Sequence, residues 1–149
     1  MMTCALLALL LAPPPVATVK VYVGPQVRDG FVDIDKGVED SIKDLKRELE
    51  RTSGVSLAAS EIAADIKPYV TRRGIGGASS IKPVMSGTVA VNIPVHSRFV
   101  EATLRVGDYE RTFFGEDREQ ENWNVCAKLL VKNVSTWLEA NRERVLRKP

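Results

Sequence analysis

The chain has 149 residues, of which 44% are hydrophobic and 27% charged, with 21 basic and 19 acidic side chains and a formal net charge of +2. This composition is ordinary for a folded domain and excludes collagen-like, low-complexity and strongly polyionic proteins. Two cysteines exclude a disulfide scaffold and an all-cysteine zinc site, and a single histidine excludes the common metal sites with two or three histidines. We therefore expect no metal and no other cofactor.

The amino terminus has the pattern of an export signal. Residues 1–17 carry no charge, and the apolar run 4–12 has the length of a signal-peptide core but is too short to cross a bilayer. Small residues at Ala12 and Ala17 offer two cleavage points. We predict a signal peptide over 1–17, a single mature domain over 18–149 without a transmembrane segment, and a periplasmic or secreted location. A disordered apolar tail or a first strand is the alternative, because no Lys or Arg precedes the apolar run.

The first half of the mature chain predicts a strand, a helix and a second strand. Residues 18–23 alternate between apolar and polar side chains, as half-buried strands do. Apolar residues recur at helical spacing over 36–52, and Asp35 is a suitable N-cap for this helix. Residues 66–72 predict another strand. Pro68 indicates an edge or a bulge there, because proline cannot donate to the ladder.

The second half predicts a glycine-rich loop, a hairpin and a long helix. Residues 73–82 contain three glycines and are expected to form a flexible loop. Residues 87–95 alternate weakly and predict either a further strand or the arm of a long hairpin. The clearest hairpin joins 99–106 to 109–114 through a two-residue turn. An apolar stripe over 122–146 predicts a helix long enough to cross a small sheet.

The order β-α-β-β-β-α predicts an α+β fold, a two-layer α/β sandwich with a mostly antiparallel sheet and both helices on one face. The first crossover would join parallel strands. Pairing across the two-residue turn would place Arg105 opposite Glu110 and Thr103 opposite Thr112. The sheet face without helices is the candidate interaction surface, and its expected residues are Lys20, Glu101, Thr103, Arg105, Glu110 and Thr112.

Short motifs in the sequence do not support a familiar chemistry. The glycines after Arg72-Arg73 lack the Walker pattern, and Ser79-Ser80-Ile81-Lys82 lacks the partner motifs of penicillin-binding enzymes. His96-Ser97 is not accompanied by a nucleophile elbow. Asp33 and Asp35 resemble the start of a calcium loop only faintly, and helix capping by Asp35 explains them better.

Two other functions are kept as alternatives to a binding module. An enzyme of unrecognised type would use carboxylates among Glu101, Glu110, Glu116 and Asp117. Glu116-Asp117-Arg118 would then form a small acid site, although capping of the last helix is the simpler interpretation. A small-ligand carrier would hold its ligand between the 73–97 loop and the sheet. The stretch 66–100 is basic, but it has no nucleic-acid motif and export is predicted, so we do not expect nucleic acid as a partner.

Short segments of the chain resemble a known group of proteins. These segments are Val19-Lys20-Val21-Tyr22-Val23, Asp40-Ser41-Ile42-Lys43-Asp44-Leu45, Ala64-Asp65-Ile66, Leu104-Arg105-Val106-Gly107-Asp108-Tyr109 and Gly115-Glu116-Asp117-Arg118. In them the chain resembles a group of small, uncharacterised exported bacterial proteins. More remotely it is similar to the amino-terminal domain of the Tol-system periplasmic protein.

The resemblance implies an α/β domain in the bacterial cell envelope and supplies no catalytic residue. We therefore expect an exported, non-enzymatic binding or interaction module whose partner is an envelope protein or a surface component. Strand addition at the Pro68 edge is one expected binding mode.

Overall fold

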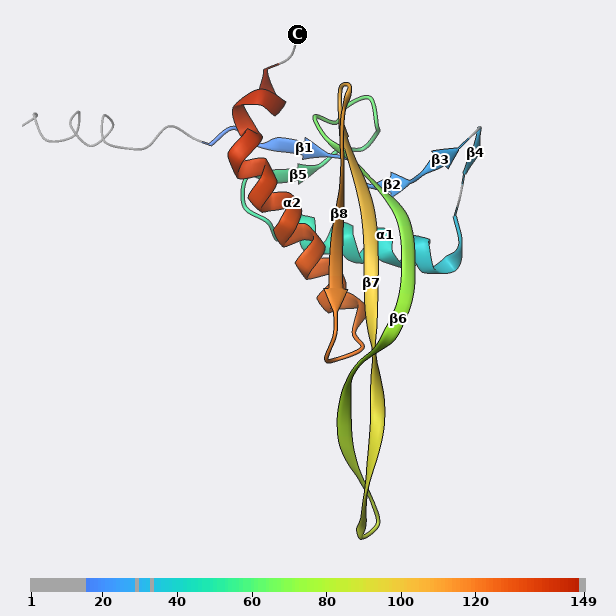
Figure 1. The fold of residues 1–149 in the computed structure, drawn as a ribbon. Helices are drawn as coiled ribbons and strands as arrows, with labels where there is room; N and C mark the ends of the chain where they lie inside the picture. The colour runs from blue at the N-terminus through green and yellow to red at the C-terminus, as the bar shows by residue number, and fades with distance from the viewer. Residues whose placement is uncertain (1–15, 29, 33, 148–149) are drawn as a thin grey trace, which may run out of the picture.

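The computed structural model describes residues 16–28, 30–32 and 34–147, and its ribbon is shown in Figure 1. Most of the predicted signal peptide, and Asp33 of the calcium-loop alternative, lie outside the described residues. The elements in chain order are β1 (Val19–Val21), β2 (Gly24–Pro25), β3 (Val27–Arg28), β4 (Phe31–Val32), α1 (Lys36–Glu50), β5 (Val55–Leu57), β6 (Lys67–Ser86), β7 (Val89–Val106), β8 (Tyr109–Asp117) and α2 (Trp123–Leu146). No helix in the described part of the chain is long and apolar enough to span a bilayer.

Within the described part of the chain the strands form three sheets, of which the largest has the order β2-β6-β7-β8. β6, β7 and β8 are antiparallel to one another, whereas β2 runs parallel to β6. β1 pairs in parallel with β5, a strand that was not predicted. The expected parallel relation between 18–23 and 66–72 is limited to the bridge between Val21 and Ile66 and is continued by the pairing of β2 with β6. β3 and β4 form a short antiparallel ribbon. The expected α+β class is confirmed. The predicted order omitted β5 and the β3–β4 ribbon, which are too short to give a periodic signal.

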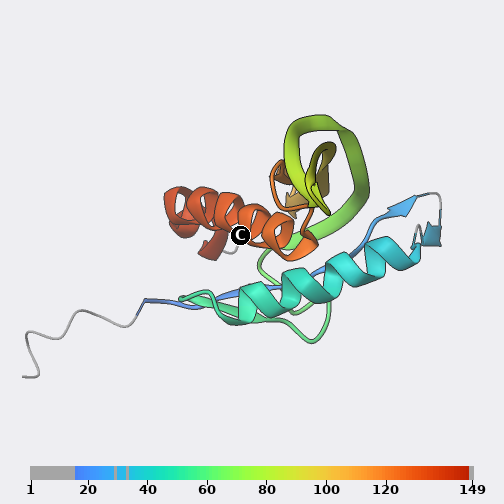
Figure 2. The same ribbon diagram turned by 90° about the horizontal axis from the view of Figure 1, so that it is seen from below.

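Both helices pack against the strands and against each other around one core (Figure 2). The Asp35 carboxylate accepts the Val38 N–H at 2.8 Å, so the predicted N-cap of α1 is confirmed. Asn122 caps α2 in the same way, and Leu130 lies at the centre of its buried face. Each helix carries its buried apolar side chains on one face. Packing of that face against the core fixes the orientation of the helix.

α2 and β8 approach each other closely at Gly115. A Cβ atom at this position would lie 2.7 Å from the backbone nitrogen of Leu130 and against the backbone of Cys126. Cys126 is fully buried, and its thiol donates to the Arg98 carbonyl at 3.1 Å. Burial raises the pKa of this thiol above its ordinary value, so Cys126 stays protonated and serves as a small core residue.

The long hairpin of β6 and β7 corrects two predictions. Residues 73–82 were expected to be a loop, but they lie within β6, whose pairing with β7 extends to Ser86. The alternative of a long hairpin for 87–95 is confirmed. Pro68 does not lie at an edge, because β6 has β7 on one side and β2 on the other. The predicted strand addition at Pro68 is therefore wrong.

Candidate functional site

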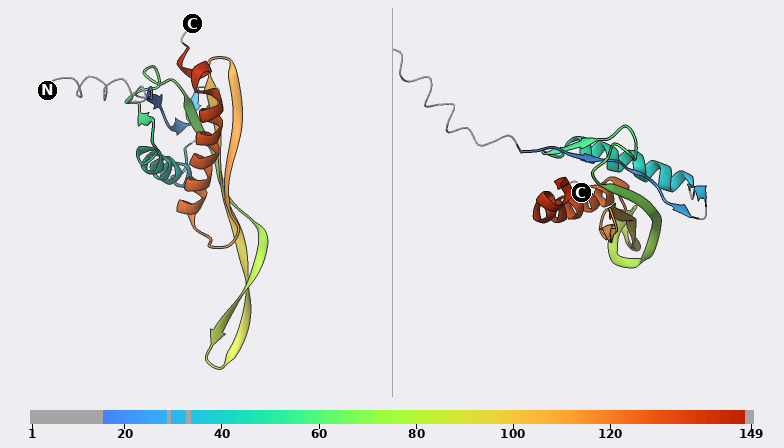
Figure 3. Two further views of the ribbon diagram at one scale, coloured as in Figure 1. Left: turned by 90° about the vertical axis from the view of Figure 1, so that its left-hand side faces the viewer. Right: turned by 90° about the horizontal axis from the view of Figure 1, so that it is seen from above.

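The most prominent surface feature is the distal part of the β6–β7 hairpin, residues 76–97, which we call the hairpin arm. β8 ends opposite Arg98, so the arm continues past the sheet, and no third strand of the described residues lies beside it. Figures 1 and 3 show it extending away from the two helices as a twisted two-stranded ribbon. Gly87 and Thr88 form the turn at its tip, and Gly87 has a φ of 65°, as the first residue of a type II′ turn requires.

Both faces of the arm carry exposed apolar side chains. Cross-strand partners share a face, and successive residues alternate between faces. Toward the tip, face one carries the cross-strand pairs Lys82 with Ile93, Val84 with Val91 and Ser86 with Val89, and nearer the root it carries Ser80 with the buried Val95. Face two contains Ile81 with Pro94, Pro83 with Asn92 and Met85 with Ala90.

The apolar side chains of the arm are unusually accessible. On face one, Val89 is 62% exposed and Ile93 46% exposed, while Ile81 and Met85 on face two are 68% and 65% exposed. Lys82 is the only charged residue in the arm at neutral pH, and the arm has neither a carboxylate nor an aromatic residue. Exposed apolar side chains gathered on one projecting element are typical of an interaction site.

The edges of the arm are less suited to binding than its faces. A two-residue turn closes on a hydrogen-bonded pair, and antiparallel pairs alternate between hydrogen-bonded and non-hydrogen-bonded types. Ser86 and Val89 form the hydrogen-bonded pair that closes the turn. Because the pair types alternate from there, Pro83 and Pro94 lie in non-hydrogen-bonded pairs, whose backbone groups point away from the partner strand. Each edge therefore has a proline where an added strand would need an N–H donor. This arrangement disfavours strand addition along both edges.

The root of the arm is held by the loop between β8 and α2. The Ser79 hydroxyl donates to the Arg118 carbonyl at 2.6 Å, and the His96 backbone N–H donates to the Glu121 carboxylate at 2.9 Å. The β6–β7 register shifts near Ala78, which increases the local twist. Loop contacts and bulges together set the direction in which the arm leaves the sheet.

Asp117 organises this loop. Its side chain is 4% exposed, and its two oxygens accept the backbone N–H groups of Glu119, Gln120 and Asn122 at 2.8–3.0 Å. Burial by itself would raise the pKa of Asp117, but the three N–H donors and the Arg98 charge outweigh it and lower the pKa. The predicted role in positioning the last helix fits this geometry.

We expect Asp117→Asn to lower the free energy of unfolding by about 1–3 kcal/mol, because charge-assisted hydrogen bonds are replaced by weaker ones. The native pKa of Asp117 is depressed, so its contribution is present above the unfolded-state pKa of about 4 and is lost as pH falls through the native pKa. Urea titrations at neutral and at acid pH should show that acid lowers the free energy of unfolding less in the variant than in wild type. Equal pH dependence in both proteins would contradict this role.

The structure brings together five of the six residues of the predicted interaction surface. Arg105 pairs with Glu110 at 2.8 Å, and the Thr103 and Thr112 hydroxyls lie 3.3 Å apart, as the predicted register requires. Glu101 accepts the Thr71 hydroxyl at 2.6 Å and lies 3.7 Å from Arg72. The charged groups among these five residues are thus paired within the chain, Arg105 with Glu110 and Glu101 with Arg72.

Lys20 is the sixth residue of that predicted surface, and it lies apart from the other five. It belongs to β1, which pairs with β5 and not with β6–β8. Its backbone N–H donates to Asp65 at 2.8 Å.

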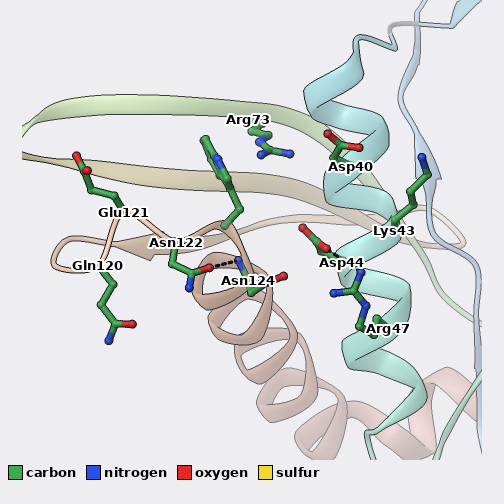
Figure 4. Close-up of a pocket in the computed structure, with 10 residues that line it drawn as sticks. Asp40, Lys43, Asp44, Arg47, Arg73, Gln120, Glu121, Asn122 and Asn124 are labelled. Carbon is green, nitrogen blue, oxygen red and sulfur yellow. Dashed lines mark hydrogen bonds and ion pairs between the residues drawn. The ribbon is translucent and has the colours of Figure 1, made fainter.

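A polar pocket of about 570 Å³ lies between α1 and the start of α2 (Figure 4). The Arg73 guanidinium lies 3.8 Å from the centroid of the Trp123 ring, and its Nη1 donates to the Gly37 carbonyl at 3.0 Å. From α1, Asp44 contributes a carboxylate that is paired with Arg47 at 3.4 Å. The pocket is wide and mixed in charge, so it has no clear preference for one ligand class.

The carboxylates considered for an enzyme do not converge. Glu116 pairs with Arg118 at 2.8 Å on the surface, and this hydrogen bond lowers the pKa of Glu116. Asp117 is occupied by backbone donors, and Glu101 and Glu110 belong to the pairs on the sheet face. Among the described residues, no group of three or more His, Cys, Asp or Glu side chains is arranged to hold a metal ion.

No protein-family model, curated protein or solved structure matches this chain. The resemblance to exported bacterial proteins and to the Tol-system domain therefore stays a prediction based on short segments.

The sequence pointed to 73–97 only as a loop that could cover a small ligand, and it did not predict a projecting hairpin, because glycines and prolines are depleted in strands. Gly74 is required by packing, since a Cβ atom there would lie 2.6 Å from the Phe99 ring. One available signal was the pair of apolar runs 81–85 and 89–95 on either side of Gly87-Thr88. Two such runs around a turn are the pattern of a hairpin.

Proposed function

We propose that the chain is an exported, non-enzymatic interaction module of the bacterial cell envelope that docks through its hairpin arm. The observation that carries the proposal is the exposure of apolar side chains on both faces of residues 76–97. The composition of the first 17 residues supports export. The folded body would then serve as a platform that holds the arm in a fixed direction.

A protein partner fits the arm better than a lipid surface does. An isolated two-stranded hairpin is only marginally stable in water, so a cover on its faces would stabilise it. A bilayer interior would leave the outward backbone groups at both edges of the arm without hydrogen-bond partners. The arm also lacks the Trp and Tyr side chains that anchor proteins at a lipid interface.

The sheet face around Arg105 and Thr112 is a weaker candidate for docking. Its charges already form pairs within the chain, and exposed ion pairs of this kind contribute little to binding. If the chain carries a small ligand, that ligand does not lie between the 73–97 segment and the sheet, because the arm extends away from the sheet instead of covering it (Figure 3). Among the described residues, the pockets open to a small ligand lie beside Arg73 and Trp123, beside Arg142, and between Phe114 and Trp137.

Site-specific photo-cross-linking in bacterial cells tests this proposal. A photoreactive amino acid would replace Met85 in the arm, Thr112 on the sheet face or Ile62 in the turn before β6. Ile62 is the matched control, because it is apolar and 97% exposed but lies on the body. The adducts would be identified by mass spectrometry in separated cell fractions, together with the intact mass of the chain.

We expect one discrete protein adduct from Met85 in the envelope fraction and none from Ile62. The chain in that fraction should be lighter by residues 1–17 or 1–12. An adduct from Thr112 alone would move the docking site to the sheet face, and no adduct from any position would contradict an interaction module. A full-length cytosolic product would contradict export.

A further inference from the structure

We propose that the outer edge of β8 is a second docking site, at which an extended, acidic segment of another protein adds as a strand between β8 and α2. The inference goes beyond the proposed function, because this site lies on the body of the chain and not on the arm. Three observations carry it. They are the open backbone edge of β8, the groove between this edge and α2, and an arginine in that groove without a carboxylate partner.

The backbone groups at the outer edge of β8 can be assigned, because β8 is the last strand of the four-stranded sheet. Val106 and Tyr109 close a two-residue turn as a hydrogen-bonded pair, and the pair types alternate from there without a register shift. Thr112 and Phe114 therefore direct their N–H and C=O groups away from β7. The Asn133 side chain of α2 supports this assignment, since it donates to the Phe114 carbonyl at 2.7 Å.

The edge at Thr112 lacks the features that protect the edges of the arm. No proline and no register shift interrupts residues 109–117, whereas each edge of the arm has a proline. An edge strand without such protection is a template for a further strand. Thr112 offers both an N–H and a C=O, which are the two groups that pair with one residue of an added antiparallel strand.

A groove of about 550 Å³ lies between this edge and α2. Residues 111–114 of β8 line one side of it. Successive strand residues point to opposite faces of a sheet, so a groove lined by four consecutive residues lies beside the strand edge. The lining of α2 follows one stripe of the helix, which consists of Asn133, Thr136, Trp137, Ala140 and Asn141. Thr136 and Ala140 are small and exposed, which leaves room for the side chains of an added strand.

The charge of the groove favours an acidic segment. Arg111 is the only charged residue among the described residues that line it. The Arg111 guanidinium lies 5.2 Å from the centroid of the Phe113 ring and forms no ion pair with a described residue. The neighbouring Glu110 is paired with Arg105 at 2.8 Å. An Asp or Glu opposite Arg111 in the added strand would therefore supply the missing carboxylate, and such cross-strand pairs are favourable.

A second copy of this chain fits the groove poorly. Edge-to-edge pairing of two β8 strands would bring the α2 helix of each copy into the space beside the other strand. The arm of a second copy has a proline on each edge and contains no carboxylate for Arg111. A single extended segment of another protein meets neither obstacle.

Peptide selection on the purified chain tests the site. The probe is taken from a random library of eight-residue peptides displayed on phage, and the most enriched peptide is synthesised and labelled. We expect the enriched peptides to contain Asp or Glu and to lack proline in their central positions. Fluorescence polarisation would measure the Kd of the synthetic peptide. No enrichment, or enrichment of peptides without an acidic residue, would overturn the proposal.

Three variants locate the binding energy. Arg111→Glu should raise the Kd of the peptide at least tenfold, and it should bind a copy with lysine in place of the acidic residue better than wild type does. Lys128→Glu is the charge-matched control at an exposed residue of α2 outside the groove, and it should bind the peptide like wild type. Ala140→Trp fills the groove without a change of charge and should also raise the Kd at least tenfold. Circular dichroism would verify that each variant is folded.

Amide exchange followed by NMR shows where the peptide binds. The Thr112 N–H points away from β7, so peptide should slow its exchange at least tenfold. The Phe113 N–H already bonds to β7 and is the internal control, whose exchange should change much less. Protection of residues 80–95 in place of Thr112, or equal binding by wild type and Arg111→Glu, would overturn the second site. The Met85 cross-link is a separate result, so either proposal can fail without the other.

Discussion

Gly115→Ala should destabilise the domain by at least about 3 kcal/mol, or prevent folding. Gly115 lies where β8 crosses α2, and an added Cβ would meet the backbone of Cys126 and the Leu130 nitrogen, the latter at 2.7 Å. Because the obstacle is helix backbone, no side-chain rotation relieves the contact. α2 would have to move away from the sheet, and its buried face would lose packing along its length.

Urea unfolding followed by tryptophan fluorescence measures this effect, since Trp137 lies on the buried face of α2. Gly77→Ala is the matched control, because a Cβ there has no atom within 4 Å and the residue does not have a positive φ. The control should unfold near the wild-type midpoint. If Gly115→Ala did the same, the close approach of β8 and α2 would be wrong.

Leu130→Ala should reduce the free energy of unfolding by about 2–5 kcal/mol. Leu130 is 1% exposed and faces α1 and β8 from the middle of α2. Truncation removes apolar contacts from a closely packed region in which α1 and α2 meet, and rigid neighbouring strands limit how far the site can collapse.

The neighbouring residue supplies the control for this prediction. Leu129 lies on the same helix and is 37% exposed, so Leu129→Ala should cost clearly less than Leu130→Ala. Both variants make the same Leu→Ala change on the same helix, so the change in helix propensity is equal in the two. The difference between their unfolding free energies therefore reports the difference in burial. Similar losses in the two variants would mean that the predicted apolar stripe does not define the core.

Elements with strong local patterns were predictable from the sequence. Asp35 and the apolar stripe after it define α1, and the alternation around Gly107-Asp108 fixes the register that places Arg105 opposite Glu110. These signals come from contacts a few residues apart, which periodicity records directly. Short strands such as β5 have no such signal, because parallel pairing with β1 defines them.

The candidate site was harder to predict because its strand character comes from distant partners. Gly74, Gly76 and Gly77 favour a loop by local propensity, but β7 supplies cross-strand partners around them and Phe99 packs over Gly74. Five of the six predicted sheet-face residues were placed correctly as neighbours, and Lys20 was not. Their mutual pairing, which weakens them as a docking surface, depends on side-chain geometry that a linear pattern does not contain.

Hydrogen exchange of the arm tests most directly whether residues 76–97 form a covered hairpin. An isolated two-stranded hairpin opens readily, so strong protection of its amides requires contact on its faces. With the protein captured by cross-linking at Met85 present, peptides covering 80–95 should be protected nearly as well as those covering 99–106. They should lose that protection in Met85→Asp while the body stays unchanged. Exchange of 80–95 at the rate of an unfolded chain in wild type, with that protein present, would contradict the account.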